Sequence, residues 1–143
     1  MRHSASVRLA YKVGLDQVRI VAERFGMPVS ATPAYLLGAR ETTLATVVTA
    51  YTMISNGGRK VTPQGIIMIL DQEGRVVHQP SRSIGKRVAG EKTIHHLTRM
   101  LMAAARYNLG RSAGGLAGKS GTSNRSRDAW FVGFSKGITA GVW

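Results

Sequence analysis

The residues best suited to chemistry stand next to one another late in the sequence, at Lys119, Ser120, Gly121 and Thr122. The lysine offers a fixed positive charge, and the two hydroxyl groups can donate hydrogen bonds to a carboxylate. Gly121 has no side chain that would obstruct a ligand lying against the backbone. We therefore predict that these residues bind the free C-terminal carboxylate of a peptide.

A lysine-serine-glycine run is short, and by itself it is also compatible with an ordinary polar turn. Its surroundings are more specific, because residues 118–134 read GKSGTSNRSRDAWFVGF and residues 139–143 read TAGVW. Within this stretch we assign Asp128 and Trp130 structural roles, since acidic and aromatic residues on a neighbouring strand more often pair or pack than catalyse.

A candidate nucleophile occurs at Ser83, three residues before Lys86, which is the spacing used by acyl-transferring serines. We reject this site for two reasons. Gly85 would lie inside the helical turn that the motif needs, and the segment is predicted to be a linker. A linker does not provide the rigid support that a nucleophile requires.

Metal and thiol chemistry are not indicated. The sequence has no cysteine, which excludes disulfides, thiolate metal sites and cysteine nucleophiles. His95 and His96 are adjacent on a predicted helix, so their side chains diverge by about 100° and suit a surface better than a shared ligand sphere. We expect no metal and no cofactor.

The strands that must position the motif are predicted over residues 116–122, 129–134 and 138–143, where β-branched and aromatic residues are separated by turn-forming residues. Three consecutive antiparallel strands are the simplest arrangement of these segments. The motif would then lie at an exposed strand edge, to which an extended peptide can add.

Apolar residues at helical spacing predict helices over residues 6–25 with an interruption at Gly14, over residues 44–55 and over residues 91–107. Asp16 is expected to cap the second part of the first segment, and Thr42 or Thr43 the second helix. A loop should run through Pro33. The apolar face of the last helix should comprise Ile94, Leu97, Met100, Leu101 and Ala104.

A peripheral antiparallel hairpin is predicted between the second and third of these helical regions. Its strands would be residues 61–70 and 76–77, which are β-branched and apolar, and residues 71–74 have the composition of a tight turn. Residues 108–118 are expected to be flexible.

Composition indicates one globular domain, since the 143 residues are 43% hydrophobic and 19% charged. The formal charge of +13 invites a nucleic-acid interpretation, but the basic residues are scattered along the chain, singly or in brief pairs such as Lys86 and Arg87. We therefore favour a solvated basic surface and expect no specific nucleic-acid partner. No apolar run approaches the roughly 20 residues of a membrane helix, and no signal peptide is recognised.

The stretch from Gly118 to Trp143 resembles the penicillin-binding protein family, in which a Lys-Thr/Ser-Gly strand precedes an Asp-Ala-Trp-Phe-Val-Gly strand. Residues 38–51, 55–58 and 61–63 are similar to the helix and loop of the bifunctional, glycosyltransferase-linked members, so the resemblance covers nearly the whole chain. It implies an α+β fold, with an antiparallel sheet and flanking helices, that forms part of a penicillin-binding/β-lactamase-like transpeptidase fold. Residues 1–143 would then be a partial transpeptidase domain.

The resemblance implies a serine D,D-transpeptidase that cross-links peptidoglycan stem peptides ending in D-alanyl-D-alanine and that is acylated by β-lactams. Lys119 and Thr122 would be its catalytic residues, with the Thr122 backbone N–H forming half of an oxyanion hole. Lys119, Ser120, Gly121 and Thr122 would bind substrate. The parent protein would be anchored in the inner membrane and would act in the periplasm.

The chain departs from the family pattern in two places. The family's Ser-x-x-Lys and Ser-x-Asn motifs should precede the first helix, but alignment places Met1 and His3 at the Ser-x-Asn positions. We therefore expect the nucleophile-bearing segment to be absent and the chain alone to be inactive. Residues 107–110 also replace the family's Gly-Thr-Gly-like turn. The alternatives are a serine β-lactamase relative and a basic, non-enzymatic binding protein.

Overall fold

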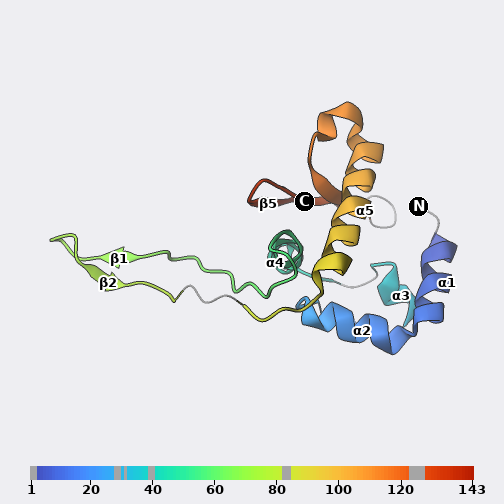
Figure 1. Ribbon diagram of the computed structural model, residues 1–143, viewed down its shortest axis with the longest axis horizontal. Coiled ribbons are helices and arrows are strands. Elements are labelled where there is room, and N and C mark those ends of the chain that lie inside the picture. Colours follow the sequence, from blue (N-terminus) through green and yellow to red (C-terminus); the bar gives the residue numbers. More distant parts are fainter. Residues whose placement is uncertain (1–2, 28–29, 31, 39–40, 82–84, 123–127) are drawn as a thin grey trace.

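Helices and antiparallel strands are combined in the computed structural model, which describes residues 3–27, 30, 32–38, 41–81, 85–122 and 128–143. The elements in chain order are α1 His3–Val13, α2 Leu15–Arg24, α3 Pro33–Leu36, α4 Leu44–Ser55, β1 Ile69–Leu70, β2 Val76–His78, α5 Glu91–Leu109, the 3₁₀ helix η1 Gly110–Ala113, β3 Ala117–Thr122, β4 Ala129–Ser135 and β5 Ile138–Val142. A long arm that ends in β1 and β2 projects from the rest (Figure 1). The predicted α+β fold with an antiparallel sheet is confirmed.

The three C-terminal strands form one antiparallel sheet in the order β3-β4-β5, as predicted. β4 and β5 are joined by Lys136 and Gly137, whose φ angles are 43° and 84°. A two-residue turn with both φ angles positive is the type I′ turn, which matches the twist of a hairpin. Among the described residues β3 pairs only with β4, so its other edge is free.

One face of this sheet is covered by helices, because α5 packs against β3 and α4 packs against β4 and β5. The core cluster at this contact joins the two helices to paired residues of β3 and β4, and it consists of Ile54, Ile94, Leu101, Ala117 and Phe134. On the opposite face Ile138 and Val142 are 71% and 65% exposed. The sheet therefore has one buried and one open face.

α4 approaches β5 closely at Gly141. A Cβ atom there would lie 2.6 Å from Cγ2 of Val48 and 2.8 Å from Cδ1 of Leu44. These distances are shorter than any normal contact, so glycine is needed for the helix to rest on the strand. A hydroxyl contact of 3.3 Å between Ser55 and Thr139 lies along the same interface.

The first helical region is broken at Gly14 (φ 98°), as predicted, but the expected Asp16 cap is wrong. Gly14 itself takes the N-cap position without a side-chain bond, and Asp16 lies within the first turn, where its carboxylate is 3.5 Å from Arg19. The Thr43 cap of α4 is confirmed, since its hydroxyl accepts a 3.1 Å hydrogen bond from the Thr46 N–H.

Two details of the other helices differ from expectation. The sequence did not predict the short helix α3, which begins at Pro33, where the predicted loop ends; proline is favoured at the first helical position. On α5, Met100 is not part of the apolar face, because it is 68% exposed whereas Ala105 is fully buried. The segment expected to be flexible instead extends α5 to Leu109 and then forms η1.

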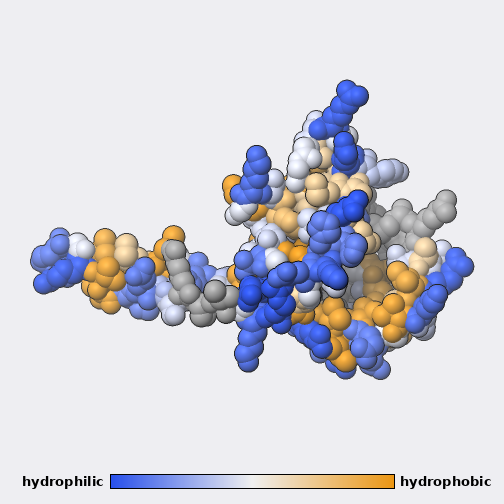
Figure 2. All heavy atoms as spheres, in the orientation of Figure 1, coloured by the Kyte–Doolittle hydropathy of each residue, from blue (hydrophilic) through white to orange (hydrophobic). Residues whose placement is uncertain are grey.

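The arm confirms the predicted hairpin and its peripheral position, but the long first strand is wrong. β1 has two residues and β2 three, while residues 61–68 are not strand. A two-stranded pair has no second layer to bury its apolar side chains, which accounts for the short pairing. Figure 2 shows apolar residues on the arm surface, and the exposed ones are Ile66, Ile67, Met68, Ile69, Leu70, Val76 and Val77.

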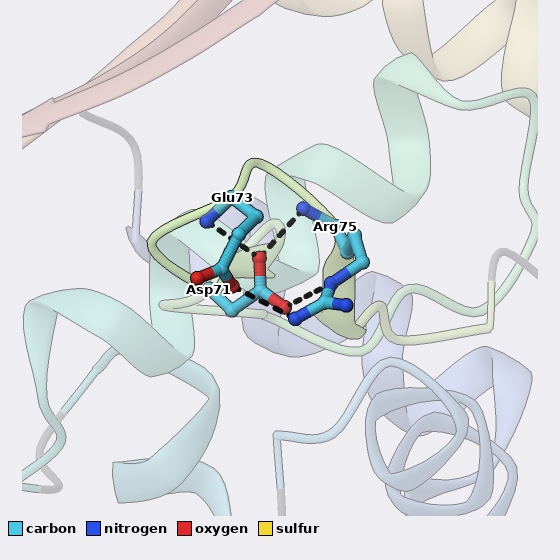
Figure 3. A network of polar contacts seen from close by, with 3 residues as sticks. All are labelled: Asp71, Glu73 and Arg75. Atoms are coloured by element: carbon cyan, nitrogen blue, oxygen red, sulfur yellow. Dashed lines mark hydrogen bonds and ion pairs between the residues drawn. The ribbon is translucent and has the colours of Figure 1, made fainter.

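A polar network closes the tip of the arm (Figure 3). Oδ1 of Asp71 accepts hydrogen bonds from the backbone N–H groups of Glu73, at 3.0 Å, and Arg75, at 2.8 Å. Oδ2 of Asp71 accepts a further bond from Nε of Arg75 at 2.6 Å. The side-chain and backbone hydrogen bonds of Arg75 hold the pKa of Asp71 below its ordinary value.

Candidate functional site

All four predicted site residues lie on β3, at the free edge of the sheet. Side chains alternate along a strand, so Lys119 and Gly121 lie on the same side as Ala117, and Ser120 and Thr122 lie on the other, although Ser120, at the edge of the sheet, is still within reach of α5. The four residues therefore do not share one face. A ligand that contacts all of them must lie along the strand edge, where both faces can be reached.

Lys119 is half-buried, and its stem lies beside the buried Val132, its register partner on β4. Its ammonium group donates to the backbone carbonyl oxygen of Ser120 at 2.5 Å. The positive charge is thus held next to the Ser120 peptide group, close to the hydroxyl groups that are predicted to bind a carboxylate.

Ser120 is linked to α5 by a contact that sequence reasoning missed. Nδ2 of Asn108, in the last turn of α5, donates to Oγ of Ser120 at 3.1 Å. The available signal was an asparagine at the end of a helix that leads into the motif strand. Spacing in the sequence does not show that the helix folds back far enough to place the two side chains together.

The glycines of β3 have different roles. A Cβ atom at Gly118 would lie 2.7 Å from Cζ of Phe131 and 2.9 Å from the carbonyl oxygen of Val132, so the fold requires glycine there. At Gly121 a Cβ atom would have only Cβ of Trp130, at 3.9 Å, as a close neighbour, and the backbone has no positive φ. Neither packing nor backbone geometry requires Gly121. This favours the prediction that Gly121 keeps the strand clear for a ligand.

A shallow groove of about 320 Å³ adjoins this end of the sheet, and its lining residues are Thr42, Leu44, Asp128, Trp130 and Trp143. Asp128 is paired within it, because its Oδ1 accepts a 3.0 Å hydrogen bond from Nε1 of Trp143. Trp130 is the register partner of Gly121. Both Asp128 and Trp130 thus have the pairing and packing roles predicted for them.

Only part of the rejected Ser-x-x-Lys motif at residues 83–86 lies within the described residues. Ser83 lies outside the described residues, whereas Gly85 and Lys86 are described and are not helical. The carbonyl oxygen of Lys86 accepts a 2.9 Å bond from the N–H of Lys60, and a Cβ atom at Gly85 would lie 1.9 Å from the carbonyl oxygen of Lys60. Close antiparallel pairing at these two residues is incompatible with the helical turn of a Ser-x-x-Lys motif.

The remaining positions named from the sequence are Met1, His3, His95 and His96. Met1 lies outside the described residues, and His3 is the first residue of α1. His95 and His96 have ring centroids 6.0 Å apart with planes inclined by 67°, and among the described residues no three His, Asp or Glu side chains come together as metal ligands. No described helix is both long and apolar enough to cross a membrane.

The candidate site thus belongs to an α+β domain whose antiparallel sheet is covered by helices on one face and carries a lysine-serine-glycine strand on its free edge. The family model described as "Penicillin binding protein transpeptidase domain" matches residues 3–141. The chain belongs to this family, and the resemblance inferred from the sequence is confirmed.

Two relatives with similar sequences are both named penicillin-binding protein 1A. That of Rickettsia typhi is 33% identical over an alignment that covers 99% of this chain and 22% of the relative. That of Neisseria flavescens is 32% identical, with 99% and 19% covered. The chain therefore spans about a fifth of the length of the curated relatives that it matches.

Solved structures agree with the fold. Penicillin-binding protein 1A from Haemophilus influenzae superposes with a TM-score of 0.86 at 22% identity, covering 97% of this chain and 28% of that one. An imipenem acyl-enzyme complex of penicillin-binding protein A from M. tuberculosis gives a TM-score of 0.77 at 20% identity, with 91% and 36% covered. At these identities the likeness confirms the fold.

Proposed function

We propose that this chain supplies the substrate-binding strand of a D,D-transpeptidase that cross-links peptidoglycan stem peptides. The observation that carries the proposal is the free edge of β3, which presents Lys119, Ser120, Gly121 and Thr122 with no further strand on it among the described residues. The family match supports an enzyme domain over a basic binding protein.

The substrate in this proposal is a stem peptide ending in D-alanyl-D-alanine, which lies along β3 as an added strand. The hydroxyl groups of Ser120 and Thr122 donate to its terminal carboxylate, and the ammonium group of Lys119 lowers the energy of the negative charge. Gly121 leaves room for the peptide to approach the strand. The catalytic roles go to Lys119 and to the backbone N–H of Thr122, which contributes half of an oxyanion hole.

The reaction has two steps. A serine hydroxyl attacks the carbonyl carbon of the penultimate D-alanine, loses its proton to a base, and forms an ester as the terminal D-alanine leaves with a proton. The amine of a second stem peptide then attacks the ester carbonyl carbon and loses a proton to the base, which passes a proton to the departing serine oxygen, so that the new peptide bond forms and the serine hydroxyl is regenerated. In both steps Thr122 N–H stabilises the oxyanion, and Lys119 provides electrostatic stabilisation.

β-Lactams are proposed as ligands of the same strand, since their carboxylate can take the place of the peptide carboxylate. The M. tuberculosis protein was solved as an imipenem acyl-enzyme complex, which supports this proposal for a protein of the same fold. Hydrolysis of the acyl-enzyme, as in a serine β-lactamase, is the second candidate. The 1A-type relatives favour transfer.

We further propose that residues 1–143 do not become acylated by themselves. The one Ser-x-x-Lys in the sequence begins at Ser83, and the described half of that motif is not helical. The reacting serine would belong to a neighbouring segment of a larger, membrane-anchored periplasmic protein. The family resemblance and the small share of the relatives' length that is matched support this assignment.

A fluorescent penicillin tests the proposal. The expected result is no covalent labelling of the isolated chain at neutral pH, together with reversible binding of an N-acyl-D-alanyl-D-alanine peptide that depends on its free carboxylate. Labelling that disappears in Ser83→Ala would make Ser83 the nucleophile and overturn the assignment. Equal binding of the carboxylate peptide and its C-terminal amide would overturn the role of β3.

A further inference from the structure

We infer that Asn108 is a positioning residue, which orients the hydroxyl group of Ser120 so that it donates to the substrate carboxylate. This inference rests on the proposed function of β3. Its basis is the 3.1 Å hydrogen bond from Nδ2 of Asn108 to Oγ of Ser120.

The direction of this bond determines what Ser120 can offer to a ligand. A serine hydroxyl has one donor and two acceptor positions, whereas an ionised carboxylate has only acceptor positions. Because Asn108 donates an N–H, it uses an acceptor position of Ser120 and leaves the O–H proton free. That proton is the group that a carboxylate needs, so the asparagine favours the productive orientation of the hydroxyl.

The fold places the backbone of Asn108 beside β3, while its side chain is exposed. It lies in the last turn of α5, and α5 is fixed to the sheet through Leu101 and the fully buried Ala105. The chain then turns at Gly110 (φ 61°) into η1, whose Ala113 is 4% exposed. A packed helix and a short connection therefore bring Asn108 close to Ser120.

Thr122, the other predicted carboxylate ligand, differs from Ser120 in this respect. Within the described part of the chain its hydroxyl has no side-chain partner, and it lies at the exposed end of β3. Its O–H can rotate toward a ligand or toward water. Asn108 should thus contribute to the recognition of a carboxylate through Ser120 alone. A double-mutant cycle on Asn108 and Ser120 therefore tests the inference.

The experiment measures dissociation constants by ¹⁵N NMR titration of the whole chain with N-acyl-D-alanyl-D-alanine and with its C-terminal amide. The variants are Asn108→Ala, Ser120→Ala and the double variant. Loss of one net hydrogen bond corresponds to a weakening of roughly three- to tenfold. We expect that loss for the carboxylate peptide in Asn108→Ala, little change for the amide, and no additional loss when Asn108→Ala is added to Ser120→Ala.

Tyr107→Ala is the matched control, because Tyr107 is the preceding residue of α5 and is 91% exposed. It should bind both peptides as the unmodified chain does. Unchanged binding by Asn108→Ala, or additive losses in the double variant, would overturn the inference while the proposed function stands. Absence of any carboxylate preference in the unmodified chain would overturn both. Amide spectra and melting temperatures establish that each variant is folded.

Discussion

Nε1 of Trp143 donates a 3.0 Å hydrogen bond to Oδ1 of Asp128, which joins the residue after β5 to the residue before β4. The bond closes the open end of the β4–β5 hairpin, opposite the turn at Lys136 and Gly137. The same two side chains line the groove beside Trp130. The pair therefore supports the strand that backs the motif on β3.

Replacing Trp143 by phenylalanine removes the indole donor but retains an aromatic ring. We expect a loss of about 0.5–1 kcal/mol in the free energy of unfolding, the usual net contribution of one hydrogen bond at a partly exposed site. Urea denaturation measures this change. In the Asp128→Ala background the same substitution should have almost no effect, and fully additive losses would show that the two residues are not coupled.

Gly121→Ala should leave the fold intact, because its new methyl group would meet only Trp130 at an ordinary distance. Peptide binding should weaken, since the methyl group would occupy the space proposed for the ligand. Circular dichroism and the same peptide titration measure the two effects separately.

Gly118→Ala is the matched control for that experiment, and it should behave in the opposite way. Its methyl group would collide with the ring of Phe131, so the free energy of unfolding should fall by about 1–3 kcal/mol, as is usual when a packed site is overfilled. If Gly121→Ala destabilised the chain as much as Gly118→Ala, the glycine at 121 would be structural and its proposed role would fail.

The tip of the arm should depend on pH. The pKa of Asp71 is lower in the folded arm than its ordinary value of 3.8, chiefly because of the Arg75 side chain. The ionised form is therefore favoured by folding. Its stabilising contribution is complete above the ordinary pKa and is lost as the pH falls below it and through the lowered folded pKa.

Carboxyl ¹³C NMR can follow this titration directly. In Arg75→Ala the pKa of Asp71 should rise toward the ordinary value, and the tip should remain ordered over a narrower pH range. A pKa of Asp71 that is the same with and without Arg75 would contradict the network in Figure 3.

The sequence predicted the parts of this protein whose pattern is local. The strand order of the C-terminal sheet, the break at Gly14 and the Thr43 cap follow from alternation, glycine and capping chemistry, and all are observed. The motif strand was recognised because its neighbour, residues 129–134, has an equally specific composition. Family identity therefore depended on two adjacent segments together.

The errors concern features that tertiary contacts decide. Met100 has the spacing and hydrophobicity of a core residue, yet the surface of α5 that meets β3 is centred on Leu101 and Ala105. Residues 61–68 have the composition of a strand but lack a partner layer among the described elements. The Asn108 contact with Ser120 required the relative position of a helix and a strand, which no spacing in the sequence supplies.

The arm leaves and re-enters the body of the protein at nearly the same point. The carbonyl oxygen of Gly58 accepts a 2.8 Å hydrogen bond from the N–H of Val88, and Arg87 also binds the carbonyl oxygen of Gly57. These contacts fix the separation of the two ends of the arm. We therefore expect that a shortened arm, or a reporter domain grafted onto its tip, would leave α5 in place relative to β3.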